Sequence, residues 1–371
     1  MKRIQMRLIY SLLSLLILLP VERVYGEAYT HTQKVLKSYK ISSESTIFIN
    51  NKYGKVHIST WNNDSVSFEI NLIIKSSNVT KVSRLRSNIK FDFVITKYNV
   101  SATTVFGSMY NSLFRDIQNL AESIVSSDNM VTIDYFVKVP VWANLNIENK
   151  YGDIFMDDTE GDLTINLSNG GIRANRLLGP SNLTLGSCDA DINYIKDGIC
   201  NVSYADMKIK EINKVDMISK SSTINIDQIN YMKLDSRRDK YYIKSITKSF
   251  GDTYFSDFDV KFLEDEISYD MKYGNIDIDQ VGKNFSLVNL SSEYTDISLT
   301  FDRSTTYNFD MTHFNDVIFY YPKEISKLQE KLVDDENKEF LVYGTIGASS
   351  VPKNKVNIKA LKKCYVKIDH K

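Results

Sequence analysis

Histidine and cysteine are scarce in this chain, and their scarcity limits the chemistry it can support. The 371 residues include only four histidines: His31, His57, His313 and His370. No two of them have the spacing of a metal-binding pair. The three cysteines, Cys188, Cys200 and Cys364, are too few for a disulfide framework, and none are spaced for zinc. A bridge between Cys188 and Cys200 would suit an oxidising compartment, and buried free thiols are the alternative.

A surplus of positive charge is absent, and so are the common catalytic motifs. Lys and Arg number 46, as do Asp and Glu, so the formal net charge is zero. A protein that binds the phosphate backbone of nucleic acid needs a basic surplus, so nucleic acid is not expected as a partner. The sequence contains no Gly-x-Ser-x-Gly elbow, phosphate-binding loop or dinucleotide fingerprint.

Proline is also rare, with 5 residues, whereas tyrosine (23) and phenylalanine (18) are abundant. Aromatic and β-branched side chains favour half-buried strands over helices. Hydrophobic residues make up 43% of the chain and charged residues 25%. This is the composition of an ordinary globular protein with enough apolar material for a sizeable core.

The first 26 residues have the pattern of a secretory signal. Three basic residues, Lys2, Arg3 and Arg7, precede a nearly unbroken apolar run from Leu8 to Leu19. Compact residues in Val24–Gly26 then mark a cleavage point before residue 27. The run has about 12 residues, fewer than the roughly 20 that cross a bilayer, so export is favoured over a membrane anchor.

One short motif recurs along the chain. Asn51–Ile58, Asn149–Met156 and Met271–Ile278 all contain Lys-Tyr-Gly, then a polar residue and a strand-forming residue. Looser copies that keep an aromatic residue are Tyr204–Met207, Phe250–Thr253, Tyr294–Ile297 and Phe314–Val317. Copies without it are Asn169–Ile172, Asp189–Ile192 and Ser221–Ile224. With Tyr241 added, the strand residues after these turns stand at 154, 172, 192, 207, 224, 241, 253, 276, 297 and 317, about 18 residues apart on average.

A period of about 18 residues fits one coil of a β-solenoid, and propeller blades or helical hairpins need roughly 34 to 50. Between the turns, apolar and polar residues alternate, which sends one set of side chains inward and the other to solvent. Coils stacked about 4.8 Å apart would then share a core. We therefore predict an all-β, single-stranded parallel β-solenoid (β-helix) with an N-terminal α/β insertion or cap. This requires Ile154, Ile172, Ile224 and Ile276 to lie in one interior.

Each part of the motif has a predicted mechanical role. Glycine would adopt positive φ at a tight corner, and the neighbouring Asp or Asn would bond to the backbone of the turn. The tyrosine before the glycine would stack on its counterpart one coil away. A ligand platform made of these tyrosines is the functional alternative.

Residues 62–138 interrupt the repeats. Val66–Ile74, Phe91–Ile95 and Val131–Pro140 are predicted strands, and Val79–Ile89 has helical spacing. Met109–Ile124 has the pattern of an amphipathic helix. Because an open solenoid end exposes unpaired backbone, we expect this helix to cap it, with a partner-binding or membrane-surface helix as the alternative.

The chain is accordingly divided into four predicted parts. They are a signal peptide (1–26), N-terminal strands with a helical insertion or cap (27–138), solenoid repeats (139–321) and C-terminal strands or cap (322–371). Within the last part, Lys323–Glu339 is charged and is expected to be irregular. Phe340–Ile368 is expected to return to strands that close the other end.

Several clusters of polar residues are candidates for a binding or catalytic site. Asp157, Asp158, Glu160 and Asp162 crowd one loop, where a solvated turn is favoured over a calcium site because their spacing matches no calcium-binding loop. The acids of the repeated turns form a predicted column: Asp153, Asp206, Asp252, Asp296 and Asp316. Paired carboxylates about 5 to 9.5 Å apart can cleave glycosidic bonds, but Asp also favours turns. Arg237 and Arg238 would form a charged corner or meet a sugar acid.

The repeated segments resemble the bacterial putative adhesin family, whose members are of Bacteroidota type. In that family an Asn-Lys-Tyr-Gly segment leads into a short strand that ends near a Trp, as in Asn51–Trp61 here. The resemblance continues at Val139–Pro140, Ala143–Leu145 and Asn149–Asp162, and Tyr343–Gly347 is similar to the closing segment. It implies an exported β-solenoid and says little about biochemistry.

These features predict a non-catalytic, adhesin-like protein of the cell envelope, in the periplasm, on the outer surface or outside the cell. Its expected partner is an envelope or surface protein or a glycan, and the mature chain should have no transmembrane segment. No catalytic, cofactor-binding or metal-binding residue is assigned, and no cofactor is expected. The alternatives are a solenoid-type carbohydrate-active enzyme and a periplasmic sensing or regulatory partner.

Overall fold

The computed structural model describes residues 28–107, 129–348 and 352–371. It is an all-β structure whose strands belong to one large, mostly parallel sheet, which confirms this part of the predicted fold. The predicted signal peptide and the predicted helix at 109–124 lie outside the described residues. No helix in the described ranges is long and apolar enough to pass through a membrane.

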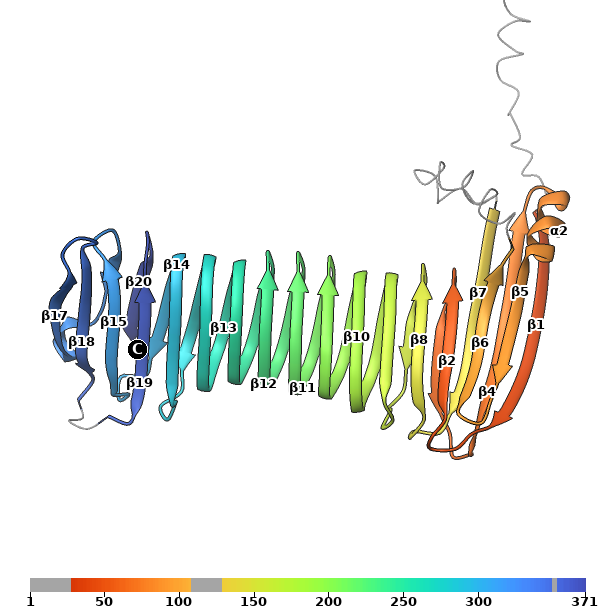
Figure 1. Cartoon of the computed structure of the whole chain (residues 1–371), viewed down its shortest axis with the longest axis horizontal. Coiled ribbons are helices and arrows are strands. Elements are labelled where there is room, and N and C mark those ends of the chain that lie inside the picture. Colours follow the sequence, from red (N-terminus) through yellow and green to blue (C-terminus); the bar gives the residue numbers. More distant parts are fainter. Residues whose placement is uncertain (1–27, 108–128, 349–351) are drawn as a thin grey trace, which may run out of the picture.

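The central part of the chain forms a stack of parallel rows along one long axis (Figure 1). Its strands are β8 (Asn144–Lys150), β9 (Ile154–Met156), β10 (Leu163–Ser203), β11 (Asp206–Lys220), β12 (Thr223–Arg237), β13 (Lys240–Val281) and β14 (Leu287–Phe301). Each row pairs with the row that follows it in sequence. Ile147 pairs with Ile165, Ile224 with Tyr241 and Ile276 with Ile297, so the offset is 18, 17 and 21 residues in turn.

The register corrects three of the predicted anchor positions. Met207 pairs with Ala190 and not with Ile192. Thr253 pairs with Ser236 inside a strand, and the ring that stacks on buried Tyr241 is Phe258, at 4.9 Å. The third error, at Val317, arises from the order of the last rows and is described below. At Ile192 and Thr253 the alternation points to the wrong residue within one strand.

A single hydrophobic core runs through the stack, as the repeat hypothesis requires. The four test residues Ile154, Ile172, Ile224 and Ile276 belong to one buried cluster and are at most 1% exposed. Outward neighbours in the same rows alternate with them as polar or charged residues. Because each row buries its apolar side chains only against its neighbours, no row is a separate folding unit.

At the N-terminal end, the stack is completed by segments that are far apart in sequence. β2 (Thr46–Lys52) and β3 (Val56–Thr60) pair in parallel with β8 and β9, and on their other side with β6 (Asn99–Phe106) and β7 (Asn129–Val139). β4 (Ser65–Ser76), β1 (Tyr29–Lys40) and β5 (Ile89–Ile95) then add antiparallel pairings. The helix α2 (Val79–Asn88) packs against them through buried Val82 and Leu85. The predicted strands and the helical spacing in this region are confirmed.

At the C-terminal end, the last residues are inserted between earlier rows. The elements are β15 (Tyr307–Phe314), β16 (Ile318–Tyr320), η2 (Lys323–Ile325), β17 (Ser326–Asp334), β18 (Glu339–Ile346), β19 (Asn354–Ala360) and β20 (Tyr365–His370). β19 and β20 pair with β14 on one side and with β15 and β16 on the other. The row at Val317 is therefore not the neighbour of Ile297. The prediction of an irregular 323–339 segment is also wrong, because β17 and β18 form an antiparallel hairpin there.

Lysines protect the outermost strands. β1 pairs only with β4 and β17 only with β18 among the described residues. β1 carries Lys34, Lys37 and Lys40, and β17 carries Lys327 and Lys331. Charged side chains on such strands oppose pairing with another chain, so the ends of the stack resist unintended association.

Candidate binding surface

One residue in each row of the stack turns the corner with a left-handed backbone. These residues have φ between 51° and 66°: Tyr53, Tyr151, Asn169, Ser187, Tyr204, Ser221, Arg238, Phe255, Tyr273 and Tyr294. The left-handed residue is therefore the tyrosine of the Lys-Tyr-Gly motif, one residue before the predicted glycine, and of the three motif glycines only Gly274 also has a positive φ, of 140°. Left-handed φ is costly for a bulky side chain, so packing must hold it in place.

The glycine of the motif is needed chiefly because of close approach between rows. A Cβ atom on Gly54, Gly152 or Gly170 would overlap the backbone of the preceding row. Other rows place a small or compact residue here: Cys188, Ala205, Ser222, Asp239, Ser256, Gly274 and Thr295. We call the left-handed residues of successive rows the corner column, and the residues that directly follow them the small-residue column. The small-residue column is buried from Cys188 to Ser256.

The asparagine of the motif ties the corner to the neighbouring backbone. Asn51 donates from Nδ2 to the carbonyl of Ile133 at 2.9 Å, and Asn149 donates to the carbonyl of Gly54 at 3.1 Å. Both asparagines are at most 1% exposed. Their amides satisfy carbonyl groups that would otherwise be buried without a donor. The residues that recur in the motif, Asn, Tyr and Gly, thus form the corner and hold it against the neighbouring row.

The predicted stacking of corner aromatics is confirmed. Tyr53 stacks on Tyr151 at 5.3 Å between ring centroids, and Tyr273 stacks on Phe255 at 4.6 Å and on Tyr294 at 5.0 Å. The corner column therefore has stacked rings in two places, Tyr53–Tyr151 and Phe255–Tyr273–Tyr294, and there each ring covers a face of its neighbour. Its geometry suits mutual support between rows better than face-on stacking of a ligand.

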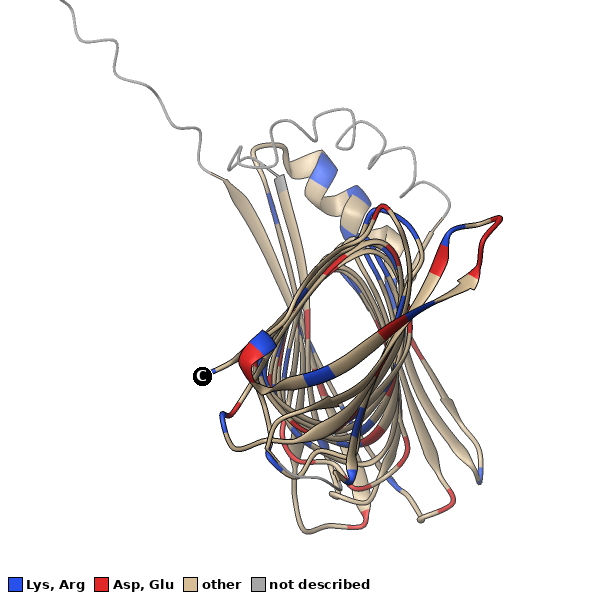
Figure 2. Ribbon diagram, turned by 90° about the vertical axis from the view of Figure 1, so that its left-hand side faces the viewer, with Lys and Arg blue, Asp and Glu red and all other residues tan. Residues whose placement is uncertain are grey.

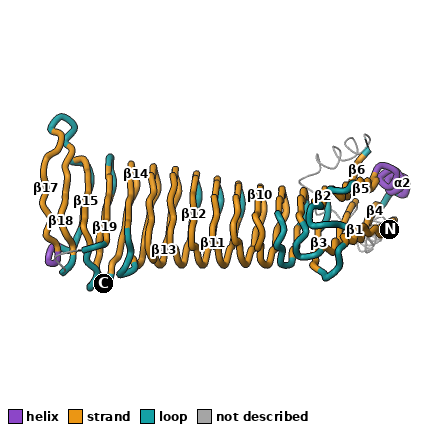
Figure 3. Tube along the Cα trace, turned by 60° about the horizontal axis from the view of Figure 1, so that its bottom comes forward, coloured by secondary structure: helices purple, strands orange, loops and turns teal. Residues whose placement is uncertain are grey.

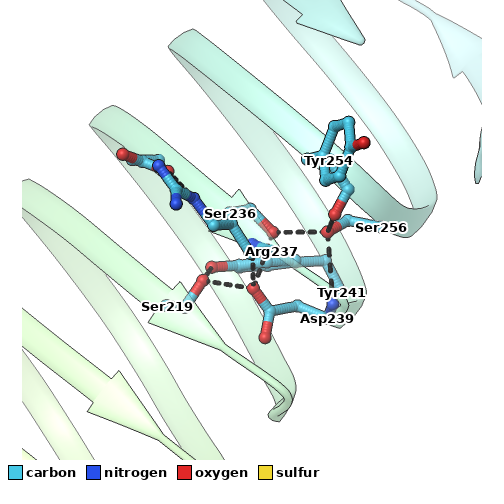
Figure 4. A network of polar contacts seen from close by, with 8 residues as sticks. Ser219, Ser236, Arg237, Asp239, Tyr241, Tyr254 and Ser256 are labelled. Atoms are coloured by element: carbon cyan, nitrogen blue, oxygen red, sulfur yellow. Dashed lines mark hydrogen bonds and ion pairs between the residues drawn. The ribbon is translucent and has the colours of Figure 1, made fainter. Parts of the chain in front are cut away.

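A buried polar network replaces the glycine in the middle of the stack (Figure 4). Asp239 is 1% exposed, and its carboxylate accepts hydrogen bonds from Ser222 N at 2.8 Å and Arg237 N at 2.9 Å. The hydroxyl groups of Ser219 and Ser236 donate to it at 2.7 Å each. Four donors compensate the burial of this charge, so Asp239 closes a corner and is not available to a ligand.

The predicted pair Arg237–Arg238 lies at this corner. Both side chains are exposed, and Arg237 Nε lies 3.4 Å from Asp235 Oδ1. Arg238 is the left-handed residue of its row, with φ of 61°. The pair therefore forms an exposed charged corner, the first of the two roles predicted for it.

The predicted column of acids is only partly correct. The position after the small residue does collect carboxylates: Asp153, Asp189, Asp206, Asp257 and Asp296. Asp189 pairs directly with Asp206, although the sequence pattern had not included it. Asp252 does not belong, because the corner of its row is at Phe255 and Asp252 lies opposite Asp235 within a strand. Asp316 does not belong either, because the row of β20 separates it from Asp296.

A shallow groove of about 500 Å³ lies over the first part of this acid column. Its charged lining consists of Asp153, Arg173, Asp189, Asp191, Asp206 and Lys208. Gly171 contributes to the hollow because no side chain fills its place between Asp153 and Asp189. In the described part of the chain, none of the six charged side chains forms an ion pair or a side-chain hydrogen bond. We call this hollow the Gly171 groove.

A second hollow of about 450 Å³ shares Phe155, Arg173 and Asp191 with the Gly171 groove. Its wall includes an aromatic stack in which His57 lies between Phe136 and Phe155, 4.7 Å from each. The guanidinium of Arg173 lies 5.8 Å from the Phe155 ring on the next row. The sequence reasoning missed this surface. The residues that indicate this surface in the sequence stand four positions after each corner: His57, Phe155, Arg173 and Asp191.

The pKa of His57 is lowered from its usual 6.5, first because burial disfavours its charged form and further by Lys55. Asp134 and Asp153 oppose the shift. Neutral His57 is therefore favoured in the folded chain, and its contribution to stability is present above about pH 6.5 and lost as pH falls toward the lowered value.

We expect NMR titration to place the pKa of His57 below 6.5. The pKa of His370 is also lowered, mainly by burial, so both residues contribute to acid sensitivity. His57→Phe retains an aromatic ring in the stack and removes one titrating group. Its stability should fall less steeply than that of the wild type as pH drops below about 6.5. An unchanged slope would contradict the assignment.

The loop that contains Asp157, Asp158, Glu160 and Asp162 is held by an ion pair and by a hydrogen bond to the backbone of another segment. Asp158 pairs with Arg176, with 2.9 Å from Nε to Oδ2, and the Arg176 hydrogen bond lowers the pKa of Asp158. Asp157 accepts a hydrogen bond from Thr60 N at 3.1 Å. Among the residues the structure describes, no three or more His, Cys, Asp or Glu side chains are arranged to hold a metal ion.

All three cysteines are free thiols and buried, so the alternative bridge between Cys188 and Cys200 is not formed. Burial raises the pKa of Cys188 to about 11 and that of Cys200 to about 12. Since the thiolate is the reactive form, these side chains are poor nucleophiles near neutral pH.

No family model and no curated protein sequence matches this chain. Among solved structures, a putative adhesin from Parabacteroides distasonis is 8% identical, with 92% of this chain and 98% of that chain covered and a TM-score of 0.33. A putative cell adhesion protein from Clostridium sporogenes is 9% identical, covers 92% and 100%, and has a TM-score of 0.19. A putative lipid binding protein from P. distasonis is 8% identical, covers 74% and 98%, and has a TM-score of 0.31. Two of the three are described as adhesion proteins, as the motif resemblance implied; TM-scores below 0.5 support no conclusion about function.

Proposed function

We propose that this chain is an exported, non-catalytic, adhesin-like binding protein. In this proposal the parallel rows are the coils of a β-solenoid, and the continuous core makes them a stiff rod. Constant offsets of 17 or 18 residues from Leu145 to Lys240 support the solenoid interpretation. The first 26 residues would be the signal peptide, followed by an N-terminal cap region (27–138), the repeats (139–321) and a C-terminal cap (322–371).

The Gly171 groove is the proposed binding site, and a glycan is the proposed ligand. The observation that carries this proposal is a set of carboxylates, Asp153, Asp189, Asp191 and Asp206, that have no ion-pair or side-chain hydrogen-bond partner among the described residues, together with Arg173. Asp189 and Asp206 are like charges directly opposite one another, a pairing that destabilises a sheet, whereas Asp191 lies opposite Lys208. Carboxylate oxygens accept hydrogen bonds from sugar hydroxyl groups, and Arg173 can donate to ring and hydroxyl oxygens. Rows about 4.8 Å apart repeat these groups along a polymeric ligand.

A glycan array with the chain lacking residues 1–26 tests this proposal. We expect retention of one glycan class, and at least about tenfold weaker binding in Asp153→Asn/Asp189→Asn, because each lost charged hydrogen bond contributes about 1.5–3 kcal/mol. The matched control is Asp277→Asn/Asp296→Asn, which changes the charge equally on exposed positions outside the groove. Equal binding by both variants, or no glycan retained, would reject the proposal.

A glycoside hydrolase is the second candidate, supported by the direct pairing of Asp189 with Asp206. Neighbouring rows place such carboxylates about 5 Å apart, close to the separation used by retaining glycosidases. Incubation of the retained glycan with the wild type distinguishes the two functions. Release of shortened products that is abolished in Asp206→Asn would replace the non-catalytic proposal.

A further inference from the structure

Charge is divided unevenly along the rod. Residues 28–106 contain eleven Lys and Arg but only four Asp and Glu, a net charge of +7. Residues 129–301, the main stack, contain 18 Lys and Arg and 27 Asp and Glu, a net charge of −9. The formal charge of zero for the whole chain therefore hides two regions of opposite sign.

The positive charge is concentrated at the N-terminal end of the rod. α2 contains Lys81, Arg84 and Arg86 and no acidic residue. Both arginines are exposed, and so are Lys37 and Lys40 on β1. Figure 3 shows α2 and β1 at one end of the long axis and β17–β18 at the other, and Figure 2 marks basic positions in blue on the ribbon of α2. We call these five residues the basic end.

The five cations of the basic end are not neutralised by any residue that the structure describes. None forms an ion pair with a residue in the described ranges, whereas nearby Lys34 pairs with Glu69 at 2.8 Å. The buried side of α2, with Val82 and Leu85, already packs on the strands, so its basic side faces outward. The basic end is therefore available to an external anion.

Exposed apolar side chains accompany these cations. Leu36 on β1 is 64% exposed, Val79 at the start of α2 is 53% exposed and Val94 on β5 is 58% exposed. Scattered cations and exposed apolar residues at one end are the combination that suits the headgroup region of a bilayer. A nucleic acid or a folded acidic protein would use the cations but would gain less from the apolar groups.

We infer that the basic end docks on an anionic lipid bilayer and that the acidic stack then projects away from it. The inference goes beyond the proposed function, since it concerns a different surface and a different ligand. An anionic bilayer attracts the N-terminal region, which carries +5 over residues 28–128 once Arg115 and the three acids of 107–128 are counted, and repels the main stack, which carries −9. The two effects act together to stand the rod upright and hold the Gly171 groove away from the lipid.

Vesicle co-sedimentation tests this inference. The chain without residues 1–26 is used, because the apolar run Leu8–Leu19 would itself enter a bilayer. We expect binding to vesicles of phosphatidylcholine with phosphatidylglycerol, little binding to phosphatidylcholine alone, and weakening by added salt. Binding that is equal for both vesicles, or capture of free inorganic phosphate without vesicle binding, would overturn it.

Charge reversal locates the surface. Lys81→Glu/Arg84→Glu/Arg86→Glu should weaken binding to the anionic vesicles by at least about tenfold, since each cation near the surface contributes to the attraction. Lys196→Glu/Lys233→Glu/Lys240→Glu makes the same charge change on exposed positions of the stack and should bind like the wild type. If the α2 variant fails to fold, as judged by circular dichroism, Lys37→Glu/Lys40→Glu provides the same test. Equal weakening by the stack variant would overturn the inference.

Discussion

Replacing Gly170 with alanine is expected to destabilise the protein by roughly 2–4 kcal/mol, although it adds a single methyl group. A Cβ atom at this position would overlap the backbone of Gly152 in the preceding row, where no flexible side chain can yield. The rows would have to separate or shift, and this would disturb the hydrogen bonds on both sides. Denaturant unfolding followed by circular dichroism measures the effect.

The adjacent Gly171 provides a matched control. A Cβ atom there would lie 3.2 Å from Asp153 Oδ1, which can rotate away, and 3.5 Å from the Asp189 carbonyl. Gly171→Ala should therefore change stability by less than about 1 kcal/mol, because the restricted unfolded chain offsets any small clash. If the two alanine variants unfold at the same denaturant concentration, close approach of the rows is not what requires glycine at this corner.

Asp239→Ala is the second substitution for which we expect a large effect, a loss of roughly 3 kcal/mol or more. The variant leaves Ser222 N, Arg237 N and two serine hydroxyl groups without their buried acceptor. Each buried donor without an acceptor costs about 1–3 kcal/mol. The shift of the denaturant midpoint measures the total loss of stability. The stability of Asp239→Asn should lie between those of the wild type and Asp239→Ala, because asparagine retains the shape of the side chain but not its charge.

Asp252→Ala is the control for this experiment. Asp252 is exposed and lies in the neighbouring row, so its removal should change stability by no more than about 0.5 kcal/mol. A midpoint for Asp239→Ala that matches that of Asp252→Ala would mean that water replaces the carboxylate without cost. The network of Figure 4 would then have no structural importance.

The all-β, mostly parallel arrangement could be predicted because it depends on local regularities. Alternating apolar residues and a recurring corner are visible without knowing what each segment touches. The position of Ile154, Ile172, Ile224 and Ile276 in one core follows from that pattern. The exact register could not be predicted, since Ile192 and Ala190 are both inward-facing and only the corner at Ser187 distinguishes them.

The candidate site was harder to predict because it depends on register and on a missing side chain. Asp252 follows a glycine and matched the motif, yet Gly251 lies within a strand and the corner of that row has no glycine. Once the corner column is known, Arg173, Asp189 and Asp191 fall on one face. The hollow at Gly171 is harder still to predict, because it exists only where glycine has no side chain to fill the space.

The insertion of residues 354–370 between β14 and β15 has a consequence for the timing of folding. Rows from β8 to β14 can assemble one after another as the polypeptide emerges, because each needs only its predecessor. The segment from Tyr307 to Ile346 must wait for the final residues before it gains its place. A polypeptide that stops before Asn354 would leave one edge of β14 unpaired, the edge that β19 and β20 cover, and prone to join other molecules. This end of the stack is closed only after residues 354–370 have been made.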